Sequence, residues 1–103
     1  MEYLTKENFD QTIRSGKKLL LCLYRKNHPG STLALERMKE INALIARDFE
    51  CYLIDTENQP EINYALDFKE APEYISIKNS KIHSRASGYL YTNQILDLLK
   101  EKR

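Results

Sequence analysis

The spacing of hydrophobic positions along the chain predicts an α/β domain built around one buried strand. Residues Leu19–Tyr24 are apolar without alternation, which is typical of a strand covered on both faces. From Pro29 to about Arg47, apolar residues recur at helical spacing, and charged residues lie mostly on the opposite side. This pattern indicates a long amphipathic helix. Its expected buried stripe consists of Leu35, Met38, Ile41, Leu44 and Ile45.

The segment before the buried strand predicts a short first strand and a first helix. We place the strand around Tyr3. Thr5 is typical of a helix N-cap, because its hydroxyl can accept a hydrogen bond from a free backbone N–H of the first turn. We expect this helix to continue to about Ser15 and to end at Gly16.

After the long helix, the pattern predicts another strand followed by a helix. Phe49–Ile54 is a short apolar strand, and Asp55 closes it. Asn58, with Glu61 three residues later, resembles a capping box. The expected helix then continues to about Leu66.

The last third of the chain predicts a β-hairpin and a final helix. Strands at Tyr74–Ile77 and Ile82–Ser87 are separated by the turn residues Asn79 and Ser80, which makes the strands antiparallel. The complete order is β-α-β-α-β-α-β-β-α. It describes a mixed sheet in which the early strands, joined through helices, are parallel. The inner side of the final helix carries Ile95, Leu96, Leu98 and Leu99.

Length and charge restrict the possible classes of function. The chain has 103 residues and no linker, so we expect a single domain over residues 1–103. A net charge of +1 gives no overall field for nucleic acid or an anionic membrane. No apolar run approaches the roughly 20 residues of a membrane span. The N-terminus lacks a basic start followed by an apolar stretch, which predicts a cytoplasmic protein without a secretory signal.

The chain has two cysteines, Cys22 and Cys51, and both lie inside predicted strands. Two thiols within apolar runs fit a reducing compartment better than a disulfide framework. Buried thiols stay protonated and unreactive, so we interpret both cysteines as core residues.

The order of the elements and several landmarks resemble thioredoxin. Leu4–Asp10 is similar to the family's entry into its first helix, and Asp55–Glu61 is similar to its D-V-D-E-N-P-E segment. Asn27–Ser31 stands where the family has W-C-G-P-C. Glu70–Glu73 falls on S-I-P-T, in which the peptide bond before the proline is cis. The resemblance covers nearly the whole chain. It implies the thioredoxin fold, a central mixed sheet flanked by helices on both faces.

Departures from the family pattern fall at its active site. His28 and Ser31 occupy the positions of the two redox cysteines, and neither side chain can form the mixed disulfide of the family's reaction. Cys22 occupies the position of the family's buried carboxylate. The resemblance therefore implies a domain without dithiol–disulfide oxidoreductase activity. We assign it no catalytic residue, cofactor or metal.

The leading hypothesis is a module that binds a protein or peptide. Thioredoxins lay a partner's extended segment beside the residue before the cis-proline, and the resemblance assigns that place to Ala71. Backbone pairing there needs no cysteine. Tyrosines after Gly88 would supply rigid contact surface. The expected contact residues are Asn27, His28, Ser31, Ala71, Pro72, Glu73, Tyr89 and Tyr91.

Two alternative functions are compatible with the sequence. One is a thiol-redox protein of thioredoxin descent that acts through Cys22 or Cys51. The other is an anion or small-ligand site at the start of the long helix, around His28 and Ser31. The free backbone N–H groups of that helix start would contribute to such a site, and Arg25 would add positive charge together with Lys26.

Overall fold

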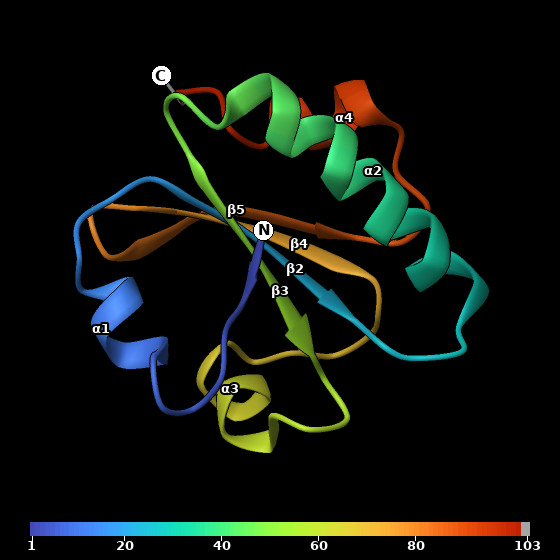
Figure 1. Ribbon diagram of the computed structural model, residues 1–103, viewed down its shortest axis with the longest axis horizontal. Coiled ribbons are helices and arrows are strands. Elements are labelled where there is room, and N and C mark those ends of the chain that lie inside the picture. The colour runs from blue at the N-terminus through green and yellow to red at the C-terminus, as the bar shows by residue number, and fades with distance from the viewer. Residues whose placement is uncertain (102–103) are drawn as a thin grey trace.

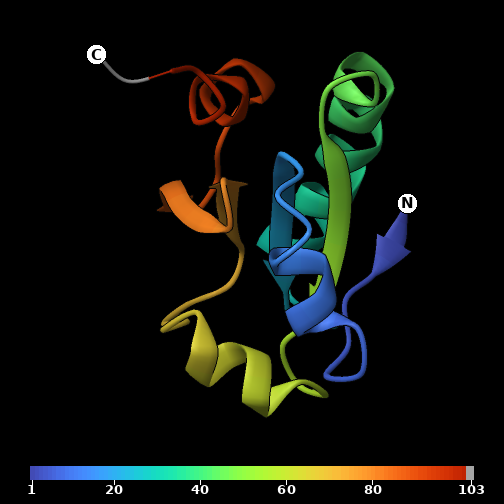
Figure 2. The same ribbon diagram turned by 90° about the vertical axis from the view of Figure 1, so that its left-hand side faces the viewer.

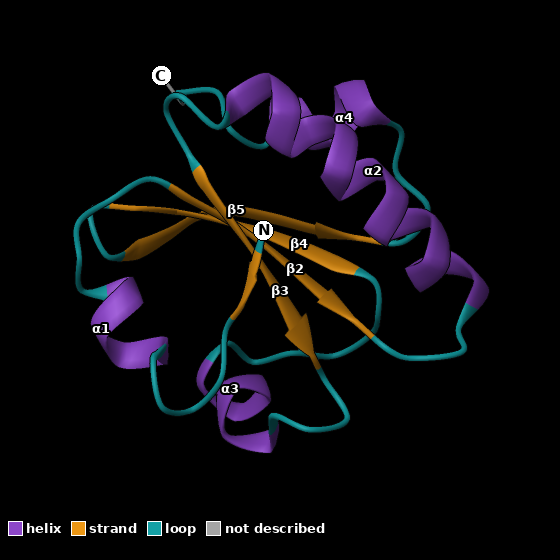
Figure 3. Cartoon of the chain, in the orientation of Figure 1, coloured by secondary structure: helices purple, strands orange, loops and turns teal. Residues whose placement is uncertain are grey.

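The computed structural model describes residues 1–101 and contains a five-stranded sheet with helices on both faces (Figure 1). The order of elements is the predicted β-α-β-α-β-α-β-β-α, so the fold class is confirmed (Figure 3). Among residues 1–101, no helix has both the length and the apolar character needed to cross a membrane. The strands are β1 (Glu2–Tyr3), β2 (Leu19–Tyr24), β3 (Glu50–Asp55), β4 (Glu73–Lys78) and β5 (Lys81–Ser87). The helices are α1 (Phe9–Ile13), α2 (Pro29–Ile45), α3 (Pro60–Ala65) and α4 (Thr92–Asp97).

The strand order in the sheet is β1-β3-β2-β4-β5, which puts β2 in the middle. β1 and β2 both run parallel to β3, as expected for early strands joined through helices. β4 also follows a helix, yet it runs antiparallel to β2 and to β5. All six residues of β2 are buried, because helices cover both faces of the sheet (Figure 2). The unbroken apolar run of this strand is the sequence signature of that position.

Two hydrophobic cores lie on opposite faces of the sheet. Helices α2 and α4 cover one face, and α1 and α3 cover the other (Figure 2). Successive side chains of a strand point to opposite faces, so β2 contributes to both cores. Leu20, Cys22 and Tyr24 pack on the side of α2 and α4. Leu19, Leu21 and Leu23 pack on the side of α1 and α3.

The hairpin of β4 and β5 is confirmed, and it contains an irregularity. Asn79 and Ser80 have φ angles of 53° and 63°, the left-handed backbone that a tight two-residue turn requires. The pairing continues from Ile77 with Ile82 to Ser76 with Ser84. One residue of β5 is therefore skipped, which is the signature of a β-bulge.

The first helix begins later than predicted. α1 starts at Phe9 with Asn8 as its N-cap, and residues 6–8 form a turn. The side-chain oxygen of Asn8 accepts a hydrogen bond from the Thr5 N–H at 2.8 Å. At the start of the helix, the Thr5 carbonyl accepts hydrogen bonds from the N–H groups of Asn8 and Phe9. Within residues 1–101, the expected hydrogen bond to the Thr5 hydroxyl is not formed there. The expected cap at Thr5 is therefore wrong.

The predicted capping box of the third helix is also wrong. α3 begins at Pro60, and Gln59 is its N-cap. The Asn58 side chain instead donates a hydrogen bond to the Asp55 carboxylate at 2.7 Å. Pro60 suits the first helical position, because its missing N–H is one that would be unpaired there in any residue.

One member of the predicted α2 stripe does not face the core. Leu44 is 67% exposed, whereas Ile45 packs against the core beside it. Ile45 continues the four-residue spacing from Ile41, and Leu44 is turned away from that line by the helical rotation. The fully buried positions of α2 are Gly30, Ser31, Ala34, Met38 and Ile41.

Candidate functional site

Three segments that are far apart in the sequence adjoin at the start of α2. The Gly88 N–H donates a hydrogen bond to the Pro72 carbonyl at 2.9 Å, which joins the loop after β5 to the loop before β4. A methyl group added at Gly30 would lie 3.2 Å from two ring carbons of Tyr89 and 3.3 Å from Cε1 of His28. The Tyr89 ring therefore lies against the first turn of α2, beside the His28 ring. We call residues 25–31, 70–73 and 88–91 the rim.

The loop before β4 leaves an unpaired backbone unit on the rim. The peptide bond between Ala71 and Pro72 is cis, which is the isomer that the resemblance implies. Pro72 is buried and Ala71 is half-buried. Within residues 1–101, neither the N–H nor the carbonyl of Ala71 takes part in a hydrogen bond. Both groups can therefore pair with an incoming strand.

Two tyrosines give the rim its exposed apolar surface. Tyr89 is 68% exposed and Tyr91 is 67% exposed. The guanidinium carbon of Arg37, from α2, lies 5.4 Å from the centroid of the Tyr91 ring, a cation–π contact. The Tyr91 N–H donates to the side-chain oxygen of Gln94 at 2.8 Å. These contacts hold Tyr91 between α2 and α4 and leave most of its ring accessible.

Ser31 is a structural residue of the helix start. It is only 1% exposed, and its hydroxyl oxygen accepts a hydrogen bond from the Arg25 N–H at 3.0 Å. His28 is the N-cap of α2, and its Nδ1 is buried without a hydrogen-bond partner in the described part of the chain. No hydrogen bond within residues 1–101 joins the Ser31 hydroxyl to the His28 ring. The two residues therefore lack the geometry of a base-activated nucleophile.

Glu73, which follows the cis-proline, is also buried. Arg85 of β5 donates to its carboxylate from Nε at 2.7 Å and from Nη2 at 3.0 Å, a two-pronged ion pair. This pairing gives both oxygens of the buried carboxylate a hydrogen-bond donor, and it fixes the beginning of β4. The predicted contact residues thus fall into two groups. Ser31, Pro72 and Glu73 are buried and shape the rim, whereas Asn27, His28, Ala71, Tyr89 and Tyr91 reach its surface in whole or in part.

The rim carries charges of both signs. Arg25 and Lys26 are exposed, and Lys26 Nζ lies 3.8 Å from a carboxylate oxygen of Asp55. Glu70 is exposed on the neighbouring loop. Within residues 1–101, no three His, Cys, Asp or Glu side chains are grouped closely enough to hold a metal ion. The rim therefore presents unpaired backbone groups, aromatic surface and exposed charges.

The two cysteines lie behind the rim, in the core between the sheet and helices α2 and α4. Cys22 is fully buried, Cys51 is 6% exposed, and neither forms a disulfide. Burial raises the pKa of the Cys22 thiol to about 12, and the nearby Cys51 acts in the same direction. Burial also raises the pKa of the Cys51 thiol to about 11. Both side chains therefore stay as neutral thiols at neutral pH, and neutral thiols are poor nucleophiles.

Sequence reasoning missed two arginines that organise the rim. Arg85 holds Glu73, and Arg37 stacks on Tyr91. Arg37 lies among the polar positions of an amphipathic helix, and no motif distinguishes it from its charged neighbours. Arg85 lies on the last strand, and its partner depends on the register of the hairpin.

The chain has a thioredoxin-like fold. Its structure matches Mala s 13, a thioredoxin of Malassezia sympodialis that belongs to a pan-allergen family, with a TM-score of 0.86 and 12% sequence identity over 95% of this chain and 87% of that chain. It also matches a chain from structural work on the thiol-resolving mechanism of a yeast mitochondrial 1-Cys peroxiredoxin via glutathione/thioredoxin systems. That match has a TM-score of 0.85 and 13% identity over 96% of this chain and 92% of that chain. No protein-family model and no curated protein sequence matches the chain.

Proposed function

We propose that this protein is a redox-inactive thioredoxin-like module that binds an extended segment of a protein or peptide through the rim. One observation carries the proposal. The backbone of Ala71, unpaired within residues 1–101, lies on the same rim as two tyrosines that are each about two-thirds exposed. Backbone groups give a bound strand its direction, and aromatic rings supply contact area with few side-chain torsions to immobilise.

In the proposed complex, each part of the rim has a separate role. A partner strand pairs with the N–H and carbonyl of Ala71, and its side chains pack against Tyr89 and Tyr91. Arg25 and Lys26 are exposed, so they mainly raise the association rate with an acidic partner and contribute little to the final affinity. The buried residues of the rim hold these groups in place.

The absence of redox activity in this proposal rests on where the thiols lie. Dithiol–disulfide exchange needs a thiolate that a substrate disulfide can reach. Burial and the raised pKa values of Cys22 and Cys51 favour a binding module over a thiol-redox protein. The use of the Ser31 hydroxyl in a backbone hydrogen bond likewise disfavours an anion site that includes this side chain. We also propose a cytoplasmic location, because two free thiols suit a reducing compartment.

Selection from a random peptide library, followed by NMR mapping of the selected peptide, tests the proposal. We expect backbone shift changes at Asn27, His28 and Ala71 and in the Tyr89–Tyr91 loop. Replacement Tyr89→Ala should weaken binding by about 2 kcal/mol, a typical loss for an aromatic contact residue. Tyr64→Ala is the matched control, because Tyr64 is 90% exposed on α3 and lies outside the rim.

Two results of the same experiment would contradict the proposal. Shift changes confined to the other edge of the sheet, around Tyr3 and α1, would show that the rim is not the binding surface. Equal losses of affinity in Tyr89→Ala and Tyr64→Ala would contradict the assignment of Tyr89 as an anchor. Lys26→Gln should change mainly the salt dependence of the association rate.

A further inference from the structure

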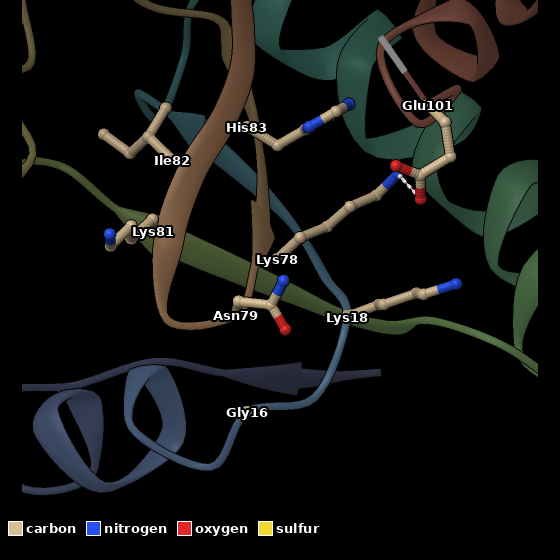
Figure 4. A pocket seen from close by; sticks show the side chains of 8 residues that line it. All are labelled: Gly16, Lys18, Lys78, Asn79, Lys81, Ile82, His83 and Glu101. Carbon is tan, nitrogen blue, oxygen red and sulfur yellow. Dashed lines mark hydrogen bonds and ion pairs between the residues drawn. The ribbon is translucent and has the colours of Figure 1, made fainter. Parts of the chain in front are cut away.

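A second surface feature lies at the end of the sheet opposite the rim. It is an open hollow of about 500 Å³ (Figure 4). Lys18 directly precedes β2, whereas the rim follows the other end of that strand. Lys78 ends β4, and His83 comes from the beginning of β5. Basic side chains from three segments therefore line one hollow that the proposed binding function does not use.

One aromatic ring holds two of these basic groups. Lys18 Nζ and Lys78 Nζ each lie 5.8 Å from the centroid of the Phe49 ring. The Lys78 side chain is only 10% exposed, so its charge is poorly screened by solvent. Both ammonium groups therefore lie close to the same ring, and a nearby anion is attracted by both charges.

The last turn of the chain fixes the direction of the basic groups. Lys78 Nζ donates a hydrogen bond to the Leu99 carbonyl at 2.7 Å. His83 Nε2 lies 2.7 Å from the Lys100 carbonyl, and because a carbonyl oxygen only accepts, Nε2 carries the proton. Lys78 and His83 are thus oriented before any ligand arrives, which reduces the entropy lost on binding.

An anion already occupies the hollow, and it belongs to the chain itself. Glu101 Oε1 lies 3.0 Å from Lys78 Nζ, and the Glu101 side chain is 75% exposed. The hydrogen bond from Lys78 lowers the pKa of Glu101, and the positive charges of Lys78 and Lys18 act in the same direction. Figure 4 shows the Lys78 side chain reaching this carboxylate, with the His83 side chain on the same side of the hollow. The position of the carboxylate is therefore a place where Lys78 and Lys18 favour negative charge.

We propose that the hollow binds a small phosphate-bearing molecule, whose oxyanion replaces the Glu101 carboxylate beside Lys78 and is also held by Lys18. The number of positive charges in the hollow favours a phosphate group over a carboxylate. Lys18, Lys78 and Lys81 all line the hollow, and of these only Lys78 forms an ion pair within residues 1–101. One carboxylate leaves the lining positive, whereas a phosphate group carries up to two negative charges and several acceptor oxygens.

The test is an NMR titration of the 103-residue chain with sodium pyrophosphate at constant ionic strength. We expect saturable shift changes at Lys18, Asn79 and His83, with the rim unaffected. Lys18→Gln should weaken binding about tenfold, and because Lys18 is exposed this replacement leaves the fold intact. Glu101→Gln should strengthen binding several-fold, because it removes the competing carboxylate. Lys69→Gln and Glu57→Gln are charge-matched controls at exposed sites around α3 and should change nothing.

Three results would overturn the proposal. The first is shift changes that do not saturate, or that appear equally at exposed lysines over the whole surface. The second is equal pyrophosphate affinity for Lys18→Gln and the unmodified chain. The third is the absence of any pyrophosphate effect together with binding to vesicles that contain phosphoinositides, which would assign the basic groups to a membrane surface. Because the rim lies at the other end of the sheet, none of these results decides the proposed peptide binding.

Discussion

The core beneath α2 contains the thiols of this chain, and the rim contains its exposed contact residues. Thioredoxins combine thiols and contact residues at one place. The core holds both sulfur atoms of the two cysteines, each buried and each with a raised pKa. The rim holds the exposed aromatic rings and the unpaired backbone of Ala71, but no thiol. In the family that the sequence resembles, reactive thiols stand on the rim, so that substrate binding and thiol exchange share one surface. Here the exposed contact residues and the two thiols lie in separate regions.

The two regions depend on different interactions. The scaffold around the start of α2 depends on packing, on the Gly88–Pro72 hydrogen bond and on the Glu73–Arg85 ion pair. None of these interactions involves a cysteine. A thiolate depends instead on exposure and on nearby positive charge, and burial removes the exposure.

The largest effect on the free energy of unfolding is expected from a replacement in the core. Met38 is fully buried in α2, so Met38→Ala leaves a cavity and should lower the free energy of unfolding by about 3 kcal/mol. Leu44→Ala is the matched control on the same helix, because Leu44 is 67% exposed, and it should change stability by less than about 0.5 kcal/mol. Urea denaturation measures both values. Equal losses would contradict the docking of α2 through its observed stripe.

A smaller effect is expected from the titration of the buried thiols. Unfolded thiols begin to ionise near pH 9, whereas the native thiols of Cys51 and Cys22 stay protonated to about 11 and 12. The native state therefore binds more protons above pH 9, and the free energy of unfolding falls as pH rises. The loss is up to about 1.4 kcal/mol per pH unit for each thiol. Below pH 9 the stabilisation is complete.

The replacement Cys22→Ala isolates this effect. It should remove about half of the loss of stability between pH 9 and 10, before the tyrosines contribute strongly. Urea denaturation at closely spaced pH values measures the slope. An unchanged slope would show that the Cys22 thiol ionises equally in the native and unfolded states, which contradicts its burial.

The smallest effect on stability is expected on the rim. Gly30→Ala places a methyl group 3.2 Å from the Tyr89 ring, which must move aside. Because that ring is largely exposed, the movement costs little, and the gain in helix propensity of up to about 1 kcal/mol offsets it. We expect a net change below about 1 kcal/mol, with clear changes in the NMR signals of the Tyr89 ring. Unchanged ring signals would show that Tyr89 does not lie over the first turn of α2.

Most of the fold could be predicted because its main elements have strong patterns. The run Leu19–Tyr24 is apolar throughout, which only a strand between two layers requires. The helix from Pro29 has a long amphipathic period and a proline at its first position. Weaker, local signals failed. The caps at Thr5 and Asn58 were predicted from short motifs, and such motifs also form turns when neighbouring groups compete for their hydrogen bonds.

The site could be predicted only in outline, because part of it depends on register. Continuing the hairpin from its turn without irregularity would pair Arg85 with Tyr74. The β-bulge instead pairs Arg85 with Ile75 and moves its side chain to the face of Glu73. No residue pattern in β5 indicates this shift, so the ion pair could not be found from the sequence. The three segments of the rim were identified through the resemblance, because nothing local connects them.

Catalysis of insulin reduction by dithiothreitol tests the central claim most directly, because it measures exchange with an exposed disulfide without requiring a known partner. The precipitation rate with the protein present should equal the rate of the blank without protein. The variants Cys22→Ser and Cys51→Ser should give that same rate. A rate above the blank that disappears in either variant would show that a buried thiol reaches the substrate, and it would contradict the separation of the binding rim from sulfur chemistry.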